Sequence, residues 1–383
     1  MANAFVEIDW IAAESLSIMS DALVIQPLTA KDKTSDWNTV PSGYQKGDTI
    51  RIKTGPDYSV QEFTSTTTTQ NIKSSNRSMV IEKHFDITVA LTAKEMALDF
   101  EGFSNEVIAP AARRLAEAVD GYIADKIILG AGLYHSTTLF ESAADVALAR
   151  KAAKIQQLNP GGRFVLMDDT LEATVLGQTW FNQAQTRGDA GLAALNEGFM
   201  GRVMGMDMFA SSNFSTLAAA SGTYGDGSST TDNTASTLNA IGTSALIVDA
   251  TSDQFEVGDH IAIAGVKRPL ICSTQTAATA TSIPLVDPIT EIIPDGAAVT
   301  VIGSGLAYVE RGAIFDDKAM AVAFPILDLP GDKVASVISD NGVSIRVVQG
   351  YTMSTKTTTM SLDVLVGAQC YDPRRITLLS NDA

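Results

Sequence analysis

The stretch SNEVIAPAARRLAEAVDGYIADKIILGAG, residues 104–132, decides the fold. Its apolar or small residues recur with the spacing of one helix face, and its charged residues fall mostly between them. The apolar positions are Ile108, Ala111, Ala112, Leu115, Val119, Tyr122, Ile123 and Ile127. Ser104 and Asn105 are good N-cap residues, and glycines are typical of the helix end that follows. The pattern therefore predicts one helix over residues 104–132, roughly 40 Å long at about 1.5 Å per residue.

Two residues interrupt this predicted helix. Pro110 lacks the backbone N–H that an interior helix position needs, so it either begins the helix or kinks it. Gly121 costs about 1 kcal/mol relative to alanine at the same position. We expect a long spine that other elements lie across, with Pro110 as a hinge.

One amphipathic stretch precedes the spine in residues 1–30, and it predicts a helix that Pro27 ends. Its apolar positions are Ile8, Ile11, Leu16, Met19 and Leu23. A lone helix of this length is marginal because most helix stability in proteins comes from packing. It therefore needs a covering surface, on its own chain or on a neighbouring copy.

Residues 49–90 predict an extended hairpin. Ile50 and Ile52 alternate with charged residues, and a second alternating run begins at Phe85. The tract TSTTTTQNIKSSNRS, residues 64–78, lies between these two strands and has no apolar pattern for a core. Such a long connection is unusual for a hairpin, so we expect it to be mobile or to pack on something else.

The remainder predicts a mixed α/β region and a small β module. Residues 139–213 alternate between helical and strand patterns, and Asp168-Asp169 precedes a short apolar helix. Residues 215–244 have linker composition, and five short β runs follow between residues 245 and 303. These runs predict an inserted β-barrel or β-sandwich. Further strands are expected over residues 343–348, 360–366 and 376–379, with a short strand or helix over 315–323.

Composition limits the function classes. The chain has 383 residues, 45% of them hydrophobic, and a formal net charge of −17. We therefore expect two or three folded domains and no general affinity for nucleic acid or for anionic membranes. Self-association must rely on local complementarity, because copies with this charge repel one another. The chain has only two cysteines, which do not suggest a disulfide framework. Its first basic residue is Lys31, and it has no apolar run of about 18 residues, so neither a secretory signal nor a membrane span is expected. These observations favour a reducing cytoplasm.

The sequence contains no strong catalytic or metal-binding motif. His84, His135 and His260 are scattered, and a site made of His260, Asp259 and Cys272 lacks zinc-like spacing. Asp168 and Asp169 suit a helix cap better than a catalytic carboxylate pair. The glycine pairs do not match phosphate-binding or dinucleotide-binding loops. We therefore expect no catalytic residue, no metal and no cofactor, and we do not expect an enzyme.

Four segments carry a resemblance to a known family. They are MALDFEGFSNEVIAPAARRLAEAVDGYIADKII (96–128), GRVMGMDMFASSNF (201–214), RGAIFDDKAMAVAF (311–324) and SIRVVQGYTMSTKTTTMSLDVLVGAQCYDPRRITLL (344–379). In this order they resemble the major capsid proteins of tailed bacteriophages, in the branch of short-tailed phage coat proteins that carry an insertion domain. The resemblance implies the α+β Johnson fold, which tailed-phage and herpesvirus shells share.

The resemblance also assigns the parts of the chain. It implies an N-terminal arm (1–48), an extended loop (49–90), a peripheral domain (91–138) with the spine helix (104–132), an axial and peripheral α/β region (139–213), an inserted β domain (214–305), and the remaining axial and closing peripheral strands (306–383). Much of residues 306–360 is expected to join residues 139–213 in the axial domain. The arm and the extended loop are expected to lie on neighbouring subunits.

The implied function is structural. Copies would assemble as pentamers and hexamers into an icosahedral shell that encloses packaged double-stranded DNA without sequence-specific binding, and the shell would expand on maturation. The expected place is the virion capsid, assembled in the cytoplasm of a bacterial host. The expected partners are further copies of the chain, a scaffolding protein and a portal protein, with a decoration protein left open. Since the extended loop begins near residue 49, we expect a separate scaffolding protein and no large N-terminal cleavage.

The expected intersubunit contacts are Lys53, Lys73, Arg77, Arg113 and Arg114. We expect the two spine arginines to form ion pairs rather than to bind phosphate. Some relatives crosslink their shells through lysine and asparagine, but no partner asparagine is evident here for the lysines of the loop. Two other functions stay open: an encapsulin-like nanocompartment shell, and an acidic hydrolase whose β module binds carbohydrate.

Overall fold

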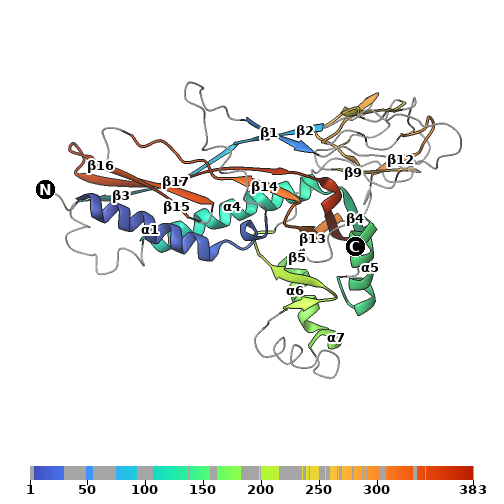
Figure 1. Cartoon of the computed structure of the whole chain (residues 1–383), viewed down its shortest axis with the longest axis horizontal. Coiled ribbons are helices and arrows are strands. Elements are labelled where there is room, and N and C mark those ends of the chain that lie inside the picture. Colours follow the sequence, from blue (N-terminus) through green and yellow to red (C-terminus); the bar gives the residue numbers. More distant parts are fainter. Residues whose placement is uncertain are drawn as a thin grey trace, which may run out of the picture. The chain divides into compact units, whose positions relative to one another are not determined.

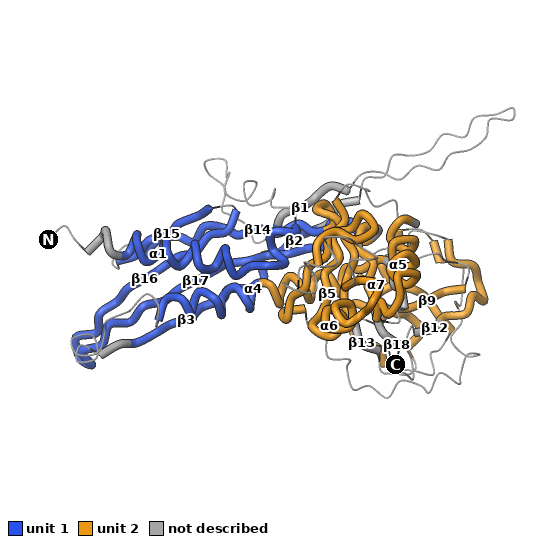
Figure 2. The backbone as a smooth tube through the Cα atoms, turned by 90° about the horizontal axis from the view of Figure 1, so that it is seen from below, with its two compact units in different colours: residues 1–119, 320–372 blue, residues 120–319, 373–383 orange. Residues whose placement is uncertain are grey.

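The computed structural model describes residues 4–29, 49–54, 75–92, 107–136, 139–155, 162–182, 198, 200–214, 235, 239–240, 242–249, 255, 259–264, 266, 270–277, 280–286, 289, 292–301, 308–330, 334–340 and 342–382. These residues form a mixed α+β structure (Figure 1). The chain divides into two compact units (Figure 2). Unit 1 comprises residues 1–119 and 320–372, and unit 2 comprises residues 120–319 and 373–383.

The predicted spine is helix α4, Ala109–Gly130, which follows a π-type turn at residues 107–108. Residues 104–106, where the prediction began, lie outside the described residues. Pro110 is exposed in the first turn, where its missing N–H needs no helical partner. It therefore begins the helix and does not kink its interior.

Glycine at position 132 is required by a close backbone approach just after α4. A Cβ atom there would lie 2.4 Å from the carbonyl oxygen of Pro373. The Gly132 N–H donates to that same oxygen at 3.0 Å. The helix therefore ends where the chain packs against the turn that precedes the last strand.

Unit 1 is built on an antiparallel sheet in the order β14-β17-β16-β15, with β3 also paired to β17. Its strands are β14 (Met320–Ala323), β17 (Thr357–Cys370), β16 (Val343–Thr352), β15 (Val334–Asp340) and β3 (Lys83–Thr92). Helix α1, Ala4–Ala22, contacts β15 and β16, and the short helix η1, Gln26–Leu28, follows it. The buried apolar residues of this helical segment include Ile8, Ala12, Leu16, Met19 and Leu23. The expectation that the arm helix lies on a neighbour is therefore wrong for α1, because its own sheet covers its apolar face.

The predicted hairpin has a different second strand. β1, Thr49–Thr54, pairs with β2, Ser75–Val80, so β2 begins inside the tract that we expected to be loop. The alternating run at 85–91 belongs to β3, which pairs with β17. There Ile87 lies opposite Leu362, an apolar cross-strand pair that stabilises the pairing of β3 with β17. The extended loop at 49–90 must therefore be shortened to the β1–β2 hairpin, and β3 belongs to the sheet of unit 1.

Unit 2 contains a six-stranded mixed sheet in the order β4-β18-β13-β5-β7-β6. Its strands are β4 (Leu133–Ser136), β18 (Ile376–Asp382), β13 (Tyr308–Asp316), β5 (Arg163–Met167), β7 (Met206–Ala210) and β6 (Arg202–Val203). Neighbours β4 and β18 are parallel, as are β5 and β7, whereas the other pairs are antiparallel. Its helices are α5 (Ala143–Ile155), α6 (Asp169–Gly177) and α7 (Thr179–Asn182).

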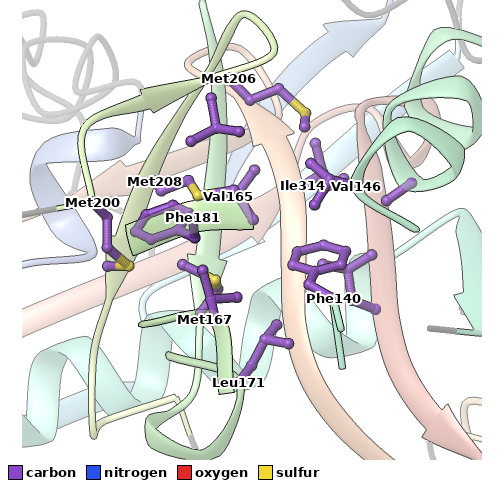
Figure 3. Close-up of a cluster of buried hydrophobic side chains, with 14 of the residues drawn as sticks. Phe140, Val146, Val165, Met167, Leu171, Phe181, Met200, Met206, Met208 and Ile314 are labelled. Carbon is purple, nitrogen blue, oxygen red and sulfur yellow. The ribbon is translucent and has the colours of Figure 1, made fainter. Parts of the chain in front are cut away.

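A compact core joins these strands and helices. Figure 3 shows the side chains of three sheet strands packed with those of the helices. The strand residues are Val165 and Met167 of β5, Met208 of β7 and Ile314 of β13, and the helix residues include Val146 of α5, Leu171 of α6 and Phe181 of α7. Phe140, just before α5, and Phe181 of α7 are both fully buried in this cluster. The α/β character predicted for residues 139–213 is therefore present, with β13 and β18 added to the same sheet.

The predicted grouping of the C-terminal segment is only partly right. Of residues 306–360, β13 joins the sheet of unit 2, whereas β15 pairs with β16, and β16 pairs with β17, in unit 1. All of these strands have similar apolar patterns, and their partners are distant in sequence, so the pattern alone does not select the sheet. The stretch 315–323 is the end of β13, a turn and β14, and contains no helix.

The described residues between 235 and 301 form short strands and turns. They comprise β8 (Ala245–Ile247), β9 (His260–Ile263), β10 (Leu270–Ile271), β11 (Ser282–Pro284) and β12 (Val299–Val301). The strands make one sheet in the order β10-β9-β12 and another of β11 and β8. They enclose a hydrophobic cluster of their own that includes Phe255, Ile261 and Ile283. The β character is as expected, and the status of this part as an inserted domain stays a prediction.

Candidate functional site

Asp168 is a helix cap and one half of an ion pair. Its Oδ1 accepts the N–H of Leu171 at 2.8 Å, in the first turn of α6. Its Oδ2 accepts from Nη1 of Arg311 on β13 at 2.9 Å. Both carboxylate oxygens therefore have structural partners, and the predicted capping role is confirmed. Asp169 is exposed in the same turn, where a negative charge suits the helix N-terminus.

A second ion pair joins the ends of β13 and β18. The pairing of Phe315 with Ile376 brings Asp316 beside Arg375, whose guanidinium bonds its carboxylate. Asp316 is buried, and this burial raises the pKa of its carboxyl group although Arg375 opposes the shift. Asp316 also accepts the N–H of Lys318 at 3.2 Å. The contact fixes a turn and a strand end, which is a structural role.

A third polar cluster lies on the sheet of unit 1. Nε and Nη2 of Arg346 donate to one oxygen of the buried Asp363, at 2.9 and 2.6 Å. The hydroxyl of Ser361 contacts the other oxygen at 2.7 Å and also reaches Asp86 on β3. Sequence reasoning missed this cluster and the Asp316–Arg375 pair. The usable signal was a charged residue in an otherwise apolar strand, which needs a partner when it is buried.

The three histidines lie on three different strands. His84 is exposed on β3, and His135 is half-buried on β4, where burial lowers its pKa. His260 lies opposite Ile271 in the β10–β9 pair. The thiol of Cys272 donates to the carbonyl of Thr274 at 3.1 Å. In the part of the chain that the structure describes, no group of three or more His, Cys, Asp or Glu residues could hold a metal ion.

An open hollow of about 710 Å³ lies beside β6, β7 and α6. Met200, Met208 and Phe209 contribute apolar atoms to it, and Glu172 lies at its wall. Its remaining charged groups are the exposed pair Arg202 and Asp207, whose Nε and Oδ1 are 3.6 Å apart. The described lining of this hollow places no nucleophile beside a base.

The predicted contact residues occupy two elements of unit 1. Register places Lys53 opposite Asn76 and Arg77 opposite Ile52, so the backbone of the β1–β2 hairpin brings these two basic positions onto adjacent strands. Lys73 lies outside the described residues. Arg113 and Arg114 are both exposed on the first half of α4. Arg114 forms the expected ion pair, with Glu117 at 2.5 Å.

Exposed apolar side chains mark surfaces that sequence reasoning missed. In unit 1 they are Trp10, Ile326, Leu329, Tyr351 and Met353, and in unit 2 they are Leu148, Met204, Ile247 and Ile292. Single exposed apolar residues are ordinary, whereas neighbouring ones can mark a contact surface. Among the described helices, none has the length and hydropathy to cross a bilayer.

Comparison with known proteins identifies the fold. No family model and no curated protein matches the sequence. A solved structure from Mycobacterium phage Che8 matches with a TM-score of 0.54 at 12% identity, over 93% of this chain and 90% of that chain. The capsid structure of cyanophage P-SCSP1u matches with a TM-score of 0.46 at 13% identity, over 88% and 84% of the two chains. The mature capsid of bacteriophage PhiM1 matches with a TM-score of 0.47 at 8% identity, over 90% of each.

The Che8 structure shares its fold with this chain, at a TM-score of 0.54. The described chain therefore has the α+β fold of that phage structure. The predicted resemblance to tailed-phage coat proteins is confirmed at the level of the fold.

Proposed function

We propose that this chain is the major capsid protein of a tailed bacteriophage, the subunit of an icosahedral shell around packaged double-stranded DNA. The fold shared with the phage Che8 structure over 93% of the chain carries the proposal. The sequence resemblance at residues 96–128 and 344–379 supports the same family independently of the structure. The proposed location is the virion capsid, with assembly in the host cytoplasm.

The mechanism is mechanical. Copies associate as pentamers and hexamers, and the β1–β2 hairpin overlaps a neighbouring subunit. The hairpin supports this role because its connection, residues 55–74, is rich in Thr and has no apolar pattern for a core of its own. Added strands of this kind bind a partner through main-chain hydrogen bonds. The basic residues Lys53, Lys73 and Arg77 of the hairpin stretch then lie at the interface, together with Arg113 and Arg114.

The net charge of −17 is consistent with a shell that encloses DNA without binding it tightly, because acidic protein and phosphates repel each other. Assembly proceeds with a separate scaffolding protein and a portal protein, and the shell expands as DNA enters. Pro110, at the start of α4, is the proposed hinge for that expansion. These interfaces are sufficient for a protein whose proposed role is structural.

The two alternatives have less support. A nanocompartment shell with a protein cargo is compatible with the fold, but no described feature favours it. The hydrolase hypothesis depended on Asp168 and Asp169, and both oxygens of Asp168 are engaged by Leu171 and Arg311. The contents of purified particles separate the two shells, because a capsid holds nuclease-protected DNA and a nanocompartment holds protein.

Sedimentation velocity tests the proposal. The chain is purified alone and with its scaffold, and it is run over a range of salt concentrations that screens the acidic charge. We expect a large, uniform species well above the 40.4 kDa of one chain. A monomer under every one of these conditions would contradict the proposal.

A further inference from the structure

The segment FPILDLP, residues 324–330, follows β14 as an irregular strap that leads toward β15. Phe324 and Pro325 are buried at its start. Ile326 and Leu329 point outward, with exposed fractions of 41% and 55%. The strap therefore presents two large apolar side chains three residues apart to the surroundings of the chain.

Two side chains of strand β16, Ser344 and Arg346, hold the strap by hydrogen bonds to its carbonyl oxygens. The hydroxyl of Ser344 lies 3.1 Å from both the Phe324 and the Pro325 carbonyl oxygens. Nη1 of Arg346 donates to the carbonyl oxygen of Asp328 at 2.9 Å. Arg346 is itself fixed by its bonds to Asp363. The outward side chains are thus held on a fixed backbone, and a partner that binds them has less conformational entropy to remove.

The backbone of the strap also has N–H donors that are unpaired among the described residues. Within the described residues, the N–H groups of Ile326, Leu327 and Leu329 make no hydrogen bond. Pro325 and Pro330 flank them and have no N–H. N–H groups without a partner among the described residues can donate to the backbone carbonyls of another chain.

We propose that the strap is a contact surface for a second copy of this chain, and this inference rests on the proposed shell function. Charge identifies the occupant. Two copies of net charge −17 repel each other wherever their acidic surfaces meet, so they associate best through surface that carries little charge. The strap has one charged side chain, Asp328, beside its two exposed apolar residues. A basic partner would instead be selected by the acidic surface elsewhere on the chain.

Site-specific photocrosslinking tests the occupant directly. Leu329 is replaced by the photoreactive amino acid p-benzoylphenylalanine in particles assembled with the scaffold, and Leu148 of α5, 49% exposed, is the matched position in unit 2. Irradiation is expected to give covalent dimers of the chain from position 329, at least fivefold more than from position 148. Equal yields at the two positions, or crosslinks from position 329 to the scaffold alone, would overturn the proposal.

A double substitution, Ile326→Ser with Leu329→Ser, tests the energetic weight of the contact. The yield of closed shells is expected to fall at least tenfold, while circular dichroism and Tm of the unassembled chain stay as in the wild type. Leu148→Ser is the control and is expected to assemble normally. Normal shells from the double variant would overturn the proposed contact at the strap and leave the proposed shell function intact. Failure of the wild type and of the control to assemble would overturn the shell function and the strap together.

Discussion

Asp86 on β3 lies directly opposite Asp363 on β17, and the hydroxyl of Ser361 reaches both carboxyl groups. The hydroxyl oxygen is 2.5 Å from Oδ1 of Asp86 and 2.7 Å from Oδ1 of Asp363. Burial pushes the pKa of Asp86 upward, but hydrogen bonds with Asp363, Ser361 and Thr88, and the charge of His84, outweigh it. The net result is a pKa below the ordinary value of 3.8. These residues connect β3, and with it the chain leading to the hairpin, to the longest strand of unit 1.

The lowered pKa of Asp86 makes the pairing of β3 with β17 sensitive to acid. A carboxyl group whose pKa is lower in the folded state stabilises that state above its unfolded pKa, here about 3.8, and this contribution is lost as pH falls through the folded pKa. In Asp86→Asn we expect a smaller difference in unfolding free energy between pH 7 and pH 3. Urea denaturation at both pH values measures it. A profile of Asp86→Asn that matches the wild type would refute the assignment.

Arg346 is expected to be the most important cation of unit 1 for stability. Arg346→Met leaves the buried carboxylate of Asp363 without its charged partner and releases the carbonyl of Asp328. Removing one partner of a buried pair typically costs roughly 3 kcal/mol or more in unfolding free energy. The control is Arg114→Met, because the Arg114–Glu117 pair is exposed and such pairs contribute at most about 1 kcal/mol. Equal losses in the two variants, measured by urea denaturation, would contradict the buried-pair account.

Asp316 is expected to show a pH dependence of the opposite sign. Its folded pKa is raised above the ordinary value of 3.8, mainly by burial, so the folded state binds the proton more tightly than the unfolded state. Stability is therefore lost as pH rises from about 3.8 through the folded pKa. Asp316→Asn cannot ionise and should lack this decline, although it can still accept from Arg375. Denaturation curves between pH 4 and pH 7 test the difference, and an unchanged slope in the variant would show that Asp316 does not titrate in this range.

The turn between β6 and β7 stores backbone strain. Met204 has a φ of 49° and Gly205 a φ of 79°, so the central residues of the two-residue turn are both left-handed. Asn-Gly is the preferred pair for such a hairpin turn, whereas a methionine in this conformation costs roughly 1 kcal/mol. Met204→Asn should therefore raise the unfolding free energy by about 1 kcal/mol.

The control for the turn is Met353→Asn. Met353 is 79% exposed in the turn between β16 and β17 and is not among the residues with positive φ. Thermal denaturation of the two variants should give a higher Tm for Met204→Asn only. An equal change in both variants would show that side-chain exposure, and not backbone strain, decides the effect.

Local features of this chain could be predicted from its sequence. Apolar periodicity located α1 and α4, and the Asp168 cap was identified because a cap acts within three residues of its helix. Alternation also located the strand at 85–91. These features depend on near neighbours along the chain, which is why a single sequence contains them.

The pairings between distant segments could not be predicted. The partner of β3 is β17, and Ser361 bonds Asp86 across 275 positions of the chain. Asp316 finds Arg375 across 59 positions, once β13 and β18 have paired. The strap was missed for a related reason, because Ile326 and Leu329 suggest core residues until the fold shows them exposed. Strand register and side-chain exposure depend on how the sheets assemble, so the apolar periodicity of the sequence does not determine them.

Negative-stain electron microscopy of the chain expressed alone and with its scaffolding protein tests the shell proposal most directly. The account predicts uniform closed shells when both proteins are present, and aberrant or missing particles when the scaffold is absent. Small soluble particles in both preparations would contradict the account, and the shared phage fold would then belong to a protein that does not form shells.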